Sequence, residues 1–248
     1  ENPLGSNVRV SSSLIRGTLK IKTMFGKEIY AERRRVLLEK MTGESGIVLF
    51  LGNADAPAQY ADNCYKFRQD SNWLYYFGID EPRFAAVIDI ESGEETIYAD
   101  DFDIDDIIWT GPMPSVRETA ESIGISRTEP YSKLDWAVSE AIIKRRNIHT
   151  IPPCRYFNKM KLQSLGVDSS SEALVKAIIS MRLVKSPEEI EEIDKTCVIG
   201  QKMHTIARKG IKPGRIEQDI VGEMEGYTLA KGWGVSFPTI LTQHGEIF

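Results

Sequence analysis

Cysteine is scarce in this sequence, and the few cysteines are poorly placed for pairing. Cys64, Cys154 and Cys197 are odd in number and far apart, and no Cys-x-x-Cys motif occurs. A disulfide framework needs an even set of cysteines in an oxidising compartment. We therefore expect three free thiols and a cytoplasmic protein.

Histidine is equally scarce, and no common catalytic motif takes its place. None of His149, His204 and His244 has a second His or Cys at the spacing of metal ligands. The Gly-x-Ser-x-Gly motif of serine hydrolases, the phosphate loop and Gly-x-Gly-x-x-Gly are all missing. These absences leave the chain without an assignable catalytic residue or metal ligand.

Long apolar runs and an excess of positive charge are also lacking. No stretch approaches the roughly 18 apolar residues of a membrane span. The net charge of −5 provides no basic footprint for phosphate binding. We expect neither membrane nor nucleic acid as a partner. With 248 residues, 42% of them hydrophobic, the chain can form one large or two small domains.

The spacing of apolar residues switches between that of helices and that of strands along the chain, which predicts an α/β domain. Helical spacing is found over residues 27–41, 116–123, 134–145, 159–165 and 172–179. Strands are expected over 46–52 and 147–152, with a hairpin formed by 84–90 and 96–99. The first of these is a continuous apolar run bounded by glycines, which is typical of a strand covered on both faces.

Two charged runs are interpreted as solvated surface. Arg33-Arg34-Arg35 lies inside the first predicted helix and is expected on its outer face. The acidic segment 100–106 lacks the turn glycine of a calcium loop, so we expect an exposed loop.

The last quarter of the chain predicts two helices and a strand. Ser186-Pro187-Glu188-Glu189 combines an N-cap serine, proline at the first helical position and a glutamate that reaches back to the cap. That helix is expected to end near Gly210. A second amphipathic helix follows from Ile216, and residues 235–241 are predicted to form a strand.

One aromatic-rich stretch, residues 65–79, stands out. Asp70 or Ser71 can cap a short helix, because a side-chain oxygen there accepts a bond from a first-turn N–H. Trp73, Tyr76 and Phe77 then fall on one helical face, and Gly78 can end the helix at positive φ. By itself this pattern describes a capped core helix.

The same stretch resembles a family signature. Phe67-Arg68-Gln69-Asp70-Ser71-x-x-x-Tyr75-x-x-Gly78 is similar to the N-terminal domain of aminopeptidase P (Xaa-Pro aminopeptidase), in the creatinase/prolidase superfamily. Residues 181–190 resemble the segment that leads into the family's catalytic domain. The resemblance covers residues 24–248, and its motif residues are expected to be structural: Arg68, Asp70, Ser71, Tyr75 and Gly78.

The resemblance implies a domain plan. Residues 24–175 would be the N-terminal domain, with a three-layer mixed sheet between helices and a ribonuclease-H-like topology. Residues 176–185 would be a linker, and 186–248 the incomplete start of the α+β catalytic domain called pita-bread. Residues 1–23 are expected to be a tail, or residues left from expression, before a native start at Met24.

The resemblance also implies a chemistry. The family removes an N-terminal residue preceding proline from short peptides, using two Mn2+ ions held by ligands that fall after residue 248. The chain alone is therefore expected to be inactive and without its own metal site. In this family a Trp of the N-terminal domain reaches the active-site mouth of a neighbouring subunit, and Trp109 aligns with it. A homodimer or higher homo-oligomer is implied.

Two alternatives stay open. Pita-bread proteins that lack the ligands act as binding modules for peptides or proteins. A dipeptidase or a creatinase-type hydrolase would keep the fold with another substrate.

Overall fold

The computed structural model describes residues 23–60, 63–232 and 234–246, so almost all of the predicted tail lies outside the described residues. The chain divides into two compact units, with the boundary between Val184 and Lys185. The two units are described separately below.

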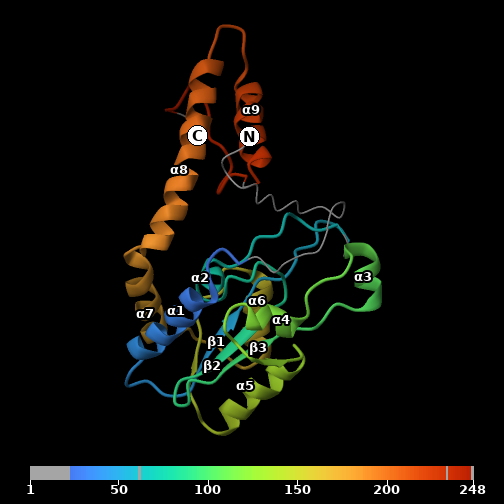
Figure 1. The fold of residues 1–248 in the computed structure, drawn as a ribbon, viewed down its shortest axis with the longest axis vertical. Coiled ribbons are helices and arrows are strands. Elements are labelled where there is room, and N and C mark those ends of the chain that lie inside the picture. Colours follow the sequence, from blue (N-terminus) through green and yellow to red (C-terminus); the bar gives the residue numbers. More distant parts are fainter. Residues whose placement is uncertain (1–22, 61–62, 233, 247–248) are drawn as a thin grey trace. The chain divides into compact units, whose positions relative to one another are not determined.

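The first unit is built on one open mixed sheet of order β4-β3-β2-β1-β5 (Figure 1). The central strand β1 (Ile47–Leu51) is antiparallel to β2 (Ala85–Asp89) and parallel to β5 (Ile148–His149). β3 (Glu95–Tyr98) pairs antiparallel with β2 and parallel with β4 (Arg127–Glu129). The expected mixed α/β fold is confirmed.

Successive side chains of β1 point to opposite faces of the sheet and pack in two separate hydrophobic cores. Val48 and Phe50 face the larger core, while Ile47 and Leu49 face the smaller one. Side chains alternate across a strand, so each face of the sheet is covered by its own helices. The larger core contains residues of α1 (Lys27–Lys40), α2 (Ser71–Phe77), α4 (Val116–Glu121) and α7 (Glu172–Leu183). The smaller contains residues of α5 (Lys133–Ile143) and α6 (Tyr156–Ser164).

The arginine run was predicted wrongly. Arg34 is fully buried and Arg33 is 7% exposed; of the three, only Arg35 is exposed. Tyr30, Arg33, Arg34 and Leu37 are spaced i, i+3, i+4 and i+7, which places both arginines on the inner face of α1. That spacing was visible in the sequence.

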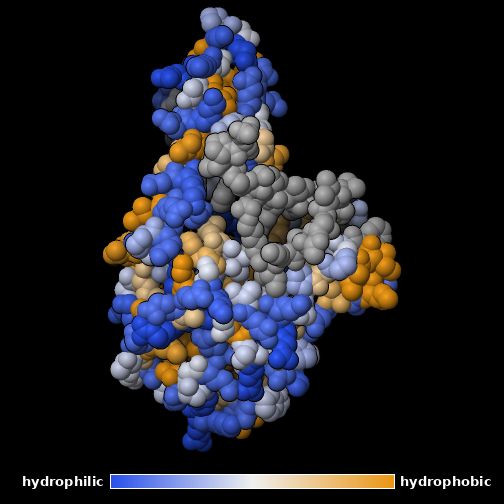
Figure 2. Space-filling model, in the orientation of Figure 1, coloured by the Kyte–Doolittle hydropathy of each residue, from blue (hydrophilic) through white to orange (hydrophobic). Residues whose placement is uncertain are grey.

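The acidic segment also differs from its prediction. Its second half begins α3 (Ile104–Thr110), and Asp103 and Asp106 form a reciprocal capping box at its start. Short carboxylates stabilise a helix N-terminus because they accept bonds from its unpaired N–H groups. Figure 2 shows an apolar surface over α3, where Ile104 and Ile108 are 75% and 74% exposed.

Three further features of this unit differ from the prediction. Strand β5 has only two residues, because Pro152 and Pro153 follow it and proline cannot donate to a ladder. The short polar strand β4 was not predicted. Residues 176–183, placed in a linker by the sequence, continue α7, since Ala177 and Ile178 pack in the larger core.

The second unit consists mainly of two helices. α8 (Pro187–Gly210) begins with the predicted capping box between Ser186 and Glu189, and α9 (Glu217–Ala230) follows. Ala207, Ile220 and Met224 form their small core. Residues 235–241 do not form the predicted strand. A strand needs a neighbour, and the described residues of this unit include none.

Within the described ranges, no helix combines the length and apolarity that crossing a membrane requires.

Candidate functional site

The motif helix α2 is fixed at both ends by its own sequence. The cap is Asp70, not Ser71: its Oδ1 accepts hydrogen bonds from the backbone N–H of Asn72 at 2.8 Å and of Trp73 at 3.0 Å. Gly78 ends the helix at φ 64°, and a Cβ there would lie 2.2 Å from the Tyr30 ring. Glycine is required at this position by both backbone and packing.

The buried arginines of α1 bind the carboxyl end of α2. Arg34 donates to the Tyr76 carbonyl oxygen at 3.0 Å, and Arg33 donates to that of Tyr75 at 2.9 Å. The last carbonyls of a helix have no partner within it and carry partial negative charge. Arg34 also pairs with Glu95 at 2.9 Å. The guanidinium groups therefore supply hydrogen-bond donors to carbonyl oxygens at the carboxyl end of α2, where the helix itself provides none.

The motif also contacts the second segment that carried the family resemblance. The Tyr75 hydroxyl donates to the Met181 carbonyl oxygen and the Tyr76 hydroxyl to the Met181 sulfur, both at 3.4 Å. Arg182 donates to the Asn72 side chain. Burial raises the pKa of Tyr76 well above its ordinary value, so its hydroxyl remains a donor. The motif thus holds the last turn of α7.

A buried amide network extends from the motif to the carboxyl end of β1. Gln69 Oε1 accepts from the backbone N–H of Asn53 at 2.6 Å, and Gln69 Nε2 donates to the Glu81 carbonyl oxygen at 2.8 Å. Asn53 Nδ2 donates to the Arg68 carbonyl oxygen at 2.7 Å. Asn158 of α6 donates to Asn53 Oδ1 at 3.3 Å. Gln69 thus links the segment before α2 to the sheet.

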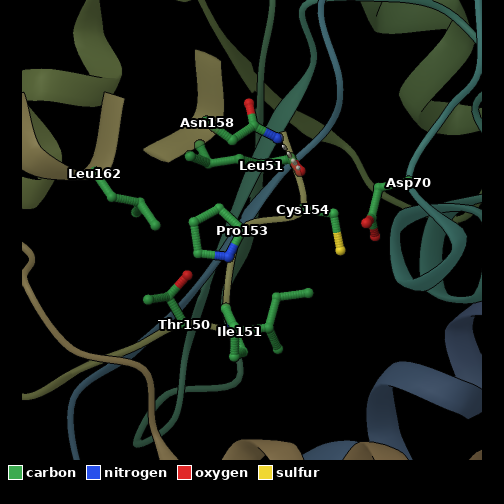
Figure 3. A pocket seen from close by; sticks show the side chains of 9 residues that line it. Leu51, Asp70, Thr150, Ile151, Pro153, Cys154, Asn158 and Leu162 are labelled. Carbon is green, nitrogen blue, oxygen red and sulfur yellow. Dashed lines mark hydrogen bonds between the residues drawn. The ribbon is translucent and has the colours of Figure 1, made fainter. Parts of the chain in front are cut away.

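A hollow lies beside this network, where the parallel strands β1 and β5 end. Its side chains come from β1, from the cap of α2, from the Thr150–Cys154 segment and from α6 (Figure 3). A second hollow of about 340 Å³ shares the wall formed by Thr150, Ile151, Pro152, Pro153 and Leu162. In open α/β sheets, ligands commonly bind beyond the carboxyl ends of strands. This joined hollow is the candidate site of the first unit.

The predicted site residues are not brought together. Asp70, Tyr75 and Gly78 belong to the packing just described, while Arg68 and Ser71 are exposed. Trp109 lies in α3, and its side chain is outside the described residues. The structure thus places the motif residues in and around α2 and Trp109 in a separate helix.

The ordinary metal ligands do not converge. In the part of the chain that the structure describes, no three His, Cys, Asp or Glu side chains form a group that could hold a metal ion. His149 is buried, with Nδ1 2.7 Å from the Ser171 hydroxyl and Nε2 3.1 Å from the Ser45 carbonyl oxygen. The three cysteines are free thiols.

Two features of this region were missed from the sequence. Gln69, Asn53 and Asn158 are separated by up to 105 positions, and no periodicity pairs them. The hollow itself depends on where the chain turns after β5. The sequence signal for it is modest: Pro152-Pro153 after an apolar segment marks the end of a strand.

Comparison with known proteins gives a consistent picture. Residues 30–149 match the model of the family "Aminopeptidase P, N-terminal domain". The chain is 27% identical over 187 residues to a probable Xaa-Pro aminopeptidase of Blastomyces gilchristii, covering 75% of this chain and 37% of that protein. It is 23% identical over 213 residues to the Xaa-Pro aminopeptidase of Escherichia coli, and this match covers 80% of this chain and 48% of that protein.

Solved structures are similar in fold. Aminopeptidase P from E. coli with the inhibitor Pro-Leu matches with a TM-score of 0.69 at 22% identity, over 84% of this chain and 50% of that one. A zinc-substituted form of the same enzyme in complex with product matches equally well. The chain spans between a third and a half of the length of the curated relatives it matches.

Proposed function

We propose that this chain is the N-terminal part of an Xaa-Pro aminopeptidase, because residues 30–149 match the model of the aminopeptidase P N-terminal domain. The whole protein would remove the residue that precedes proline at the N-terminus of a short peptide. Residues 24–175 would be its N-terminal domain, and residues 186–248 would open its catalytic domain. The observation that carries the proposal is the contact between α2 and Met181–Arg182, which joins the two resembling segments in space.

The catalytic centre would be a pair of Mn2+ ions in the whole protein. The described residues do not fit such a centre, since no three candidate ligands converge among them. We therefore propose that the 248-residue chain is inactive by itself. Bound metals in such a centre would activate a water molecule and polarise the peptide carbonyl.

The N-terminal domain would act on access and assembly. We propose that it shapes the mouth of the active site and makes the contacts of a homodimer or larger homo-oligomer. Trp109 would contribute to a neighbouring subunit's substrate site. Its location supports this role: it lies in α3, a short helix whose Ile104 and Ile108 are largely exposed. An exposed apolar helix is suited to protein contact.

The test compares the whole protein with the 248-residue chain on a matched pair of peptides. With Mn2+ supplied, the whole protein should release the first residue of an Xaa-Pro-Yaa peptide and spare the matched Xaa-Ala-Yaa peptide. The 248-residue chain should release none. Absence of release by the whole protein would refute the proposed activity, and release by the 248-residue chain would refute its proposed inactivity.

The same assay tests Trp109. Trp109→Ala in the whole protein should raise KM for the Xaa-Pro peptide more than it lowers kcat, because a residue that only binds substrate contributes to ground-state and transition-state binding alike. Trp136→Ala, at an exposed tryptophan of α5, is the matched control and should change neither.

A further inference from the structure

Helix α3 carries an apolar face that the described part of the chain leaves largely exposed. Ile104, Ile107 and Ile108 are spaced i, i+3 and i+4, which places them on one side of the helix. Ile104 and Ile108 are exposed by 75% and 74%, and the patch is visible in Figure 2. An exposed apolar patch rimmed by polar residues is typical of a protein interaction site.

The residues around this face carry charge of one sign. Residues 100–110 include five aspartates and no Lys or Arg. Asp103 and Asp106 form the capping box with each other, whereas the exposed Asp105 takes no part in it and lies next to Ile108, three residues on. A partner of α3 should therefore combine apolar side chains with positive charge, because complementary charge selects the partner of an interface.

Helix α6, in the same unit, exposes apolar side chains of suitable size. Tyr156, Phe157 and Met160 are each more than half exposed. Tyr156 and Met160 are neighbours on the helix surface at i and i+4, and Phe157 adjoins them. Aromatic residues and methionine are enriched in protein interfaces, where they bury much apolar area.

The charge of α6 is opposite to that of α3. Residues 155–167 contain no Asp or Glu. Lys161 pairs with Asp135 of α5, while Arg155 and Lys159 are exposed and form no ion pair with a described residue. Lys159 lies three residues after Tyr156, at the border of the apolar face. The two helices thus offer complementary surfaces, one acidic and aliphatic, the other basic and aromatic.

A second copy of the chain can join these surfaces. Both faces are exposed in the same copy, so α3 does not cover α6 within one chain. Two different surfaces on one chain can pair twice about a two-fold axis, because a contact of one residue with another is then repeated with the two copies exchanged. Such a dimer is closed and covers both faces in both copies.

We propose that the chain forms a two-fold dimer in which α3 of each copy packs on α6 of the other. Ile104 and Ile108 pack against the partner subunit's Met160. Asp105 pairs with the partner's Lys159. This inference deepens the homo-oligomer of the proposed function by naming its contact, and it does not rest on the proposed peptidase activity.

Sedimentation velocity of the 248-residue chain, combined with charge reversal, tests the contact. At about 100 μM the chain should sediment mainly as a dimer. Asp105→Lys and Lys159→Asp should each weaken the association about tenfold, because each places like charges opposite one another. The double variant restores the opposite charges and should recover most of the affinity.

Matched charge reversals elsewhere are the controls. Asp194→Lys on α8 and Lys66→Asp before α2 change exposed residues outside both faces and should leave the association unchanged. Circular dichroism verifies that each variant is folded.

Mixing two variants identifies the surfaces. Ile108→Asp disrupts only α3 and Met160→Asp disrupts only α6, so each variant alone should be monomeric at about 100 μM. An equimolar mixture should form a dimer, weaker than that of the unsubstituted chain, because one intact α3 can still pack on one intact α6.

Three results would overturn the proposal. The first is a monomeric unsubstituted chain at about 100 μM. The second is a Met160→Asp variant that associates like the unsubstituted chain, which would show that another surface or another protein covers α3. The third is a double charge reversal that recovers no affinity. Sedimentation does not record peptide release, so each of these results leaves the proposed peptidase activity to its own assay.

Discussion

The guanidinium of Arg34 and the carbonyl oxygen of Tyr76 lie 3.0 Å apart, and both are buried. The same guanidinium reaches Glu95 at 2.9 Å and the Ile123 carbonyl oxygen at 2.9 Å. One side chain of α1 therefore connects α2, β3 and the segment after α4. The cost of burying a charge is offset only when every partner is in place.

Removing that guanidinium should destabilise the first unit strongly. Arg34→Met keeps most of the side-chain length but leaves Glu95 and two carbonyl oxygens unpaired. The free energy of unfolding should fall by about 3–5 kcal/mol, as measured by urea denaturation. Arg35→Met is the control, because Arg35 is exposed and its ion pairs with described residues are those with Glu32 and Glu39 on its own helix. Equal effects of the two substitutions would contradict the role given to Arg34.

A methyl group at Gly78 should be costly for two separable reasons. Gly78→Ala places a non-glycine residue at φ 64° and sets its Cβ 2.2 Å from the Tyr30 ring. Gly93→Ala shares the positive φ, at 71°, but its Cβ would meet only Leu38 at 4.0 Å. We expect a loss of about 1–2 kcal/mol for Gly93→Ala from backbone strain and a clearly larger loss for Gly78→Ala. Thermal denaturation of both variants decides the point.

The attachment of α7 to the motif helix should be visible in hydrogen exchange. Arg182→Gln removes the guanidinium that donates to Asn72. Amide hydrogens in the last turn of α7 should then exchange faster with solvent. The free energy of local opening falls, because opening no longer requires that hydrogen bond to break. Lys176→Gln on the same helix loses only an exposed pair with Glu172 and should leave exchange unchanged. Unchanged protection in Arg182→Gln would show that the contact does not hold the turn.

Asp89 should make stability depend on pH in the acid range. Burial opposes its ionisation, but hydrogen bonds from Arg146 and Ser92 prevail and lower its pKa to about 2. The carboxyl is thus more acidic in the folded chain than in the unfolded one, where its pKa is about 3.9. Its contribution is complete above pH 4 and is lost as the pH falls toward 2.

Asp89→Asn tests that linkage. At pH 7 the substitution should lower the free energy of unfolding by about 1 kcal/mol after allowance for solvent screening. The difference from the unsubstituted chain should shrink between pH 4 and pH 2, as measured by denaturation at each pH. A difference that grows as the pH falls would contradict the sign of the effect.

The local features of the chain were determined by its sequence. The cap at Asp70, the helix end at Gly78, the Ser186 capping box and the buried strand β1 all depend on neighbouring residues, and they form as predicted. The α/β class followed from the alternation of helical and strand periods. The signature in residues 67–78 resembles the aminopeptidase P N-terminal domain, and residues 30–149 match the model of that family.

The tertiary structure decided what depends on distant partners. Arg33 and Arg34 are buried because the carbonyl ends of α2 lie opposite them, 42 residues away. Residues 235–241 form no strand because pairing requires a neighbour. The amides at Asn53, Gln69 and Asn158 meet only through the fold, and so does the hollow beside them. Sequence patterns carry the periodicity of one segment, whereas hydrogen bonding and burial between segments are settled only when the chain folds.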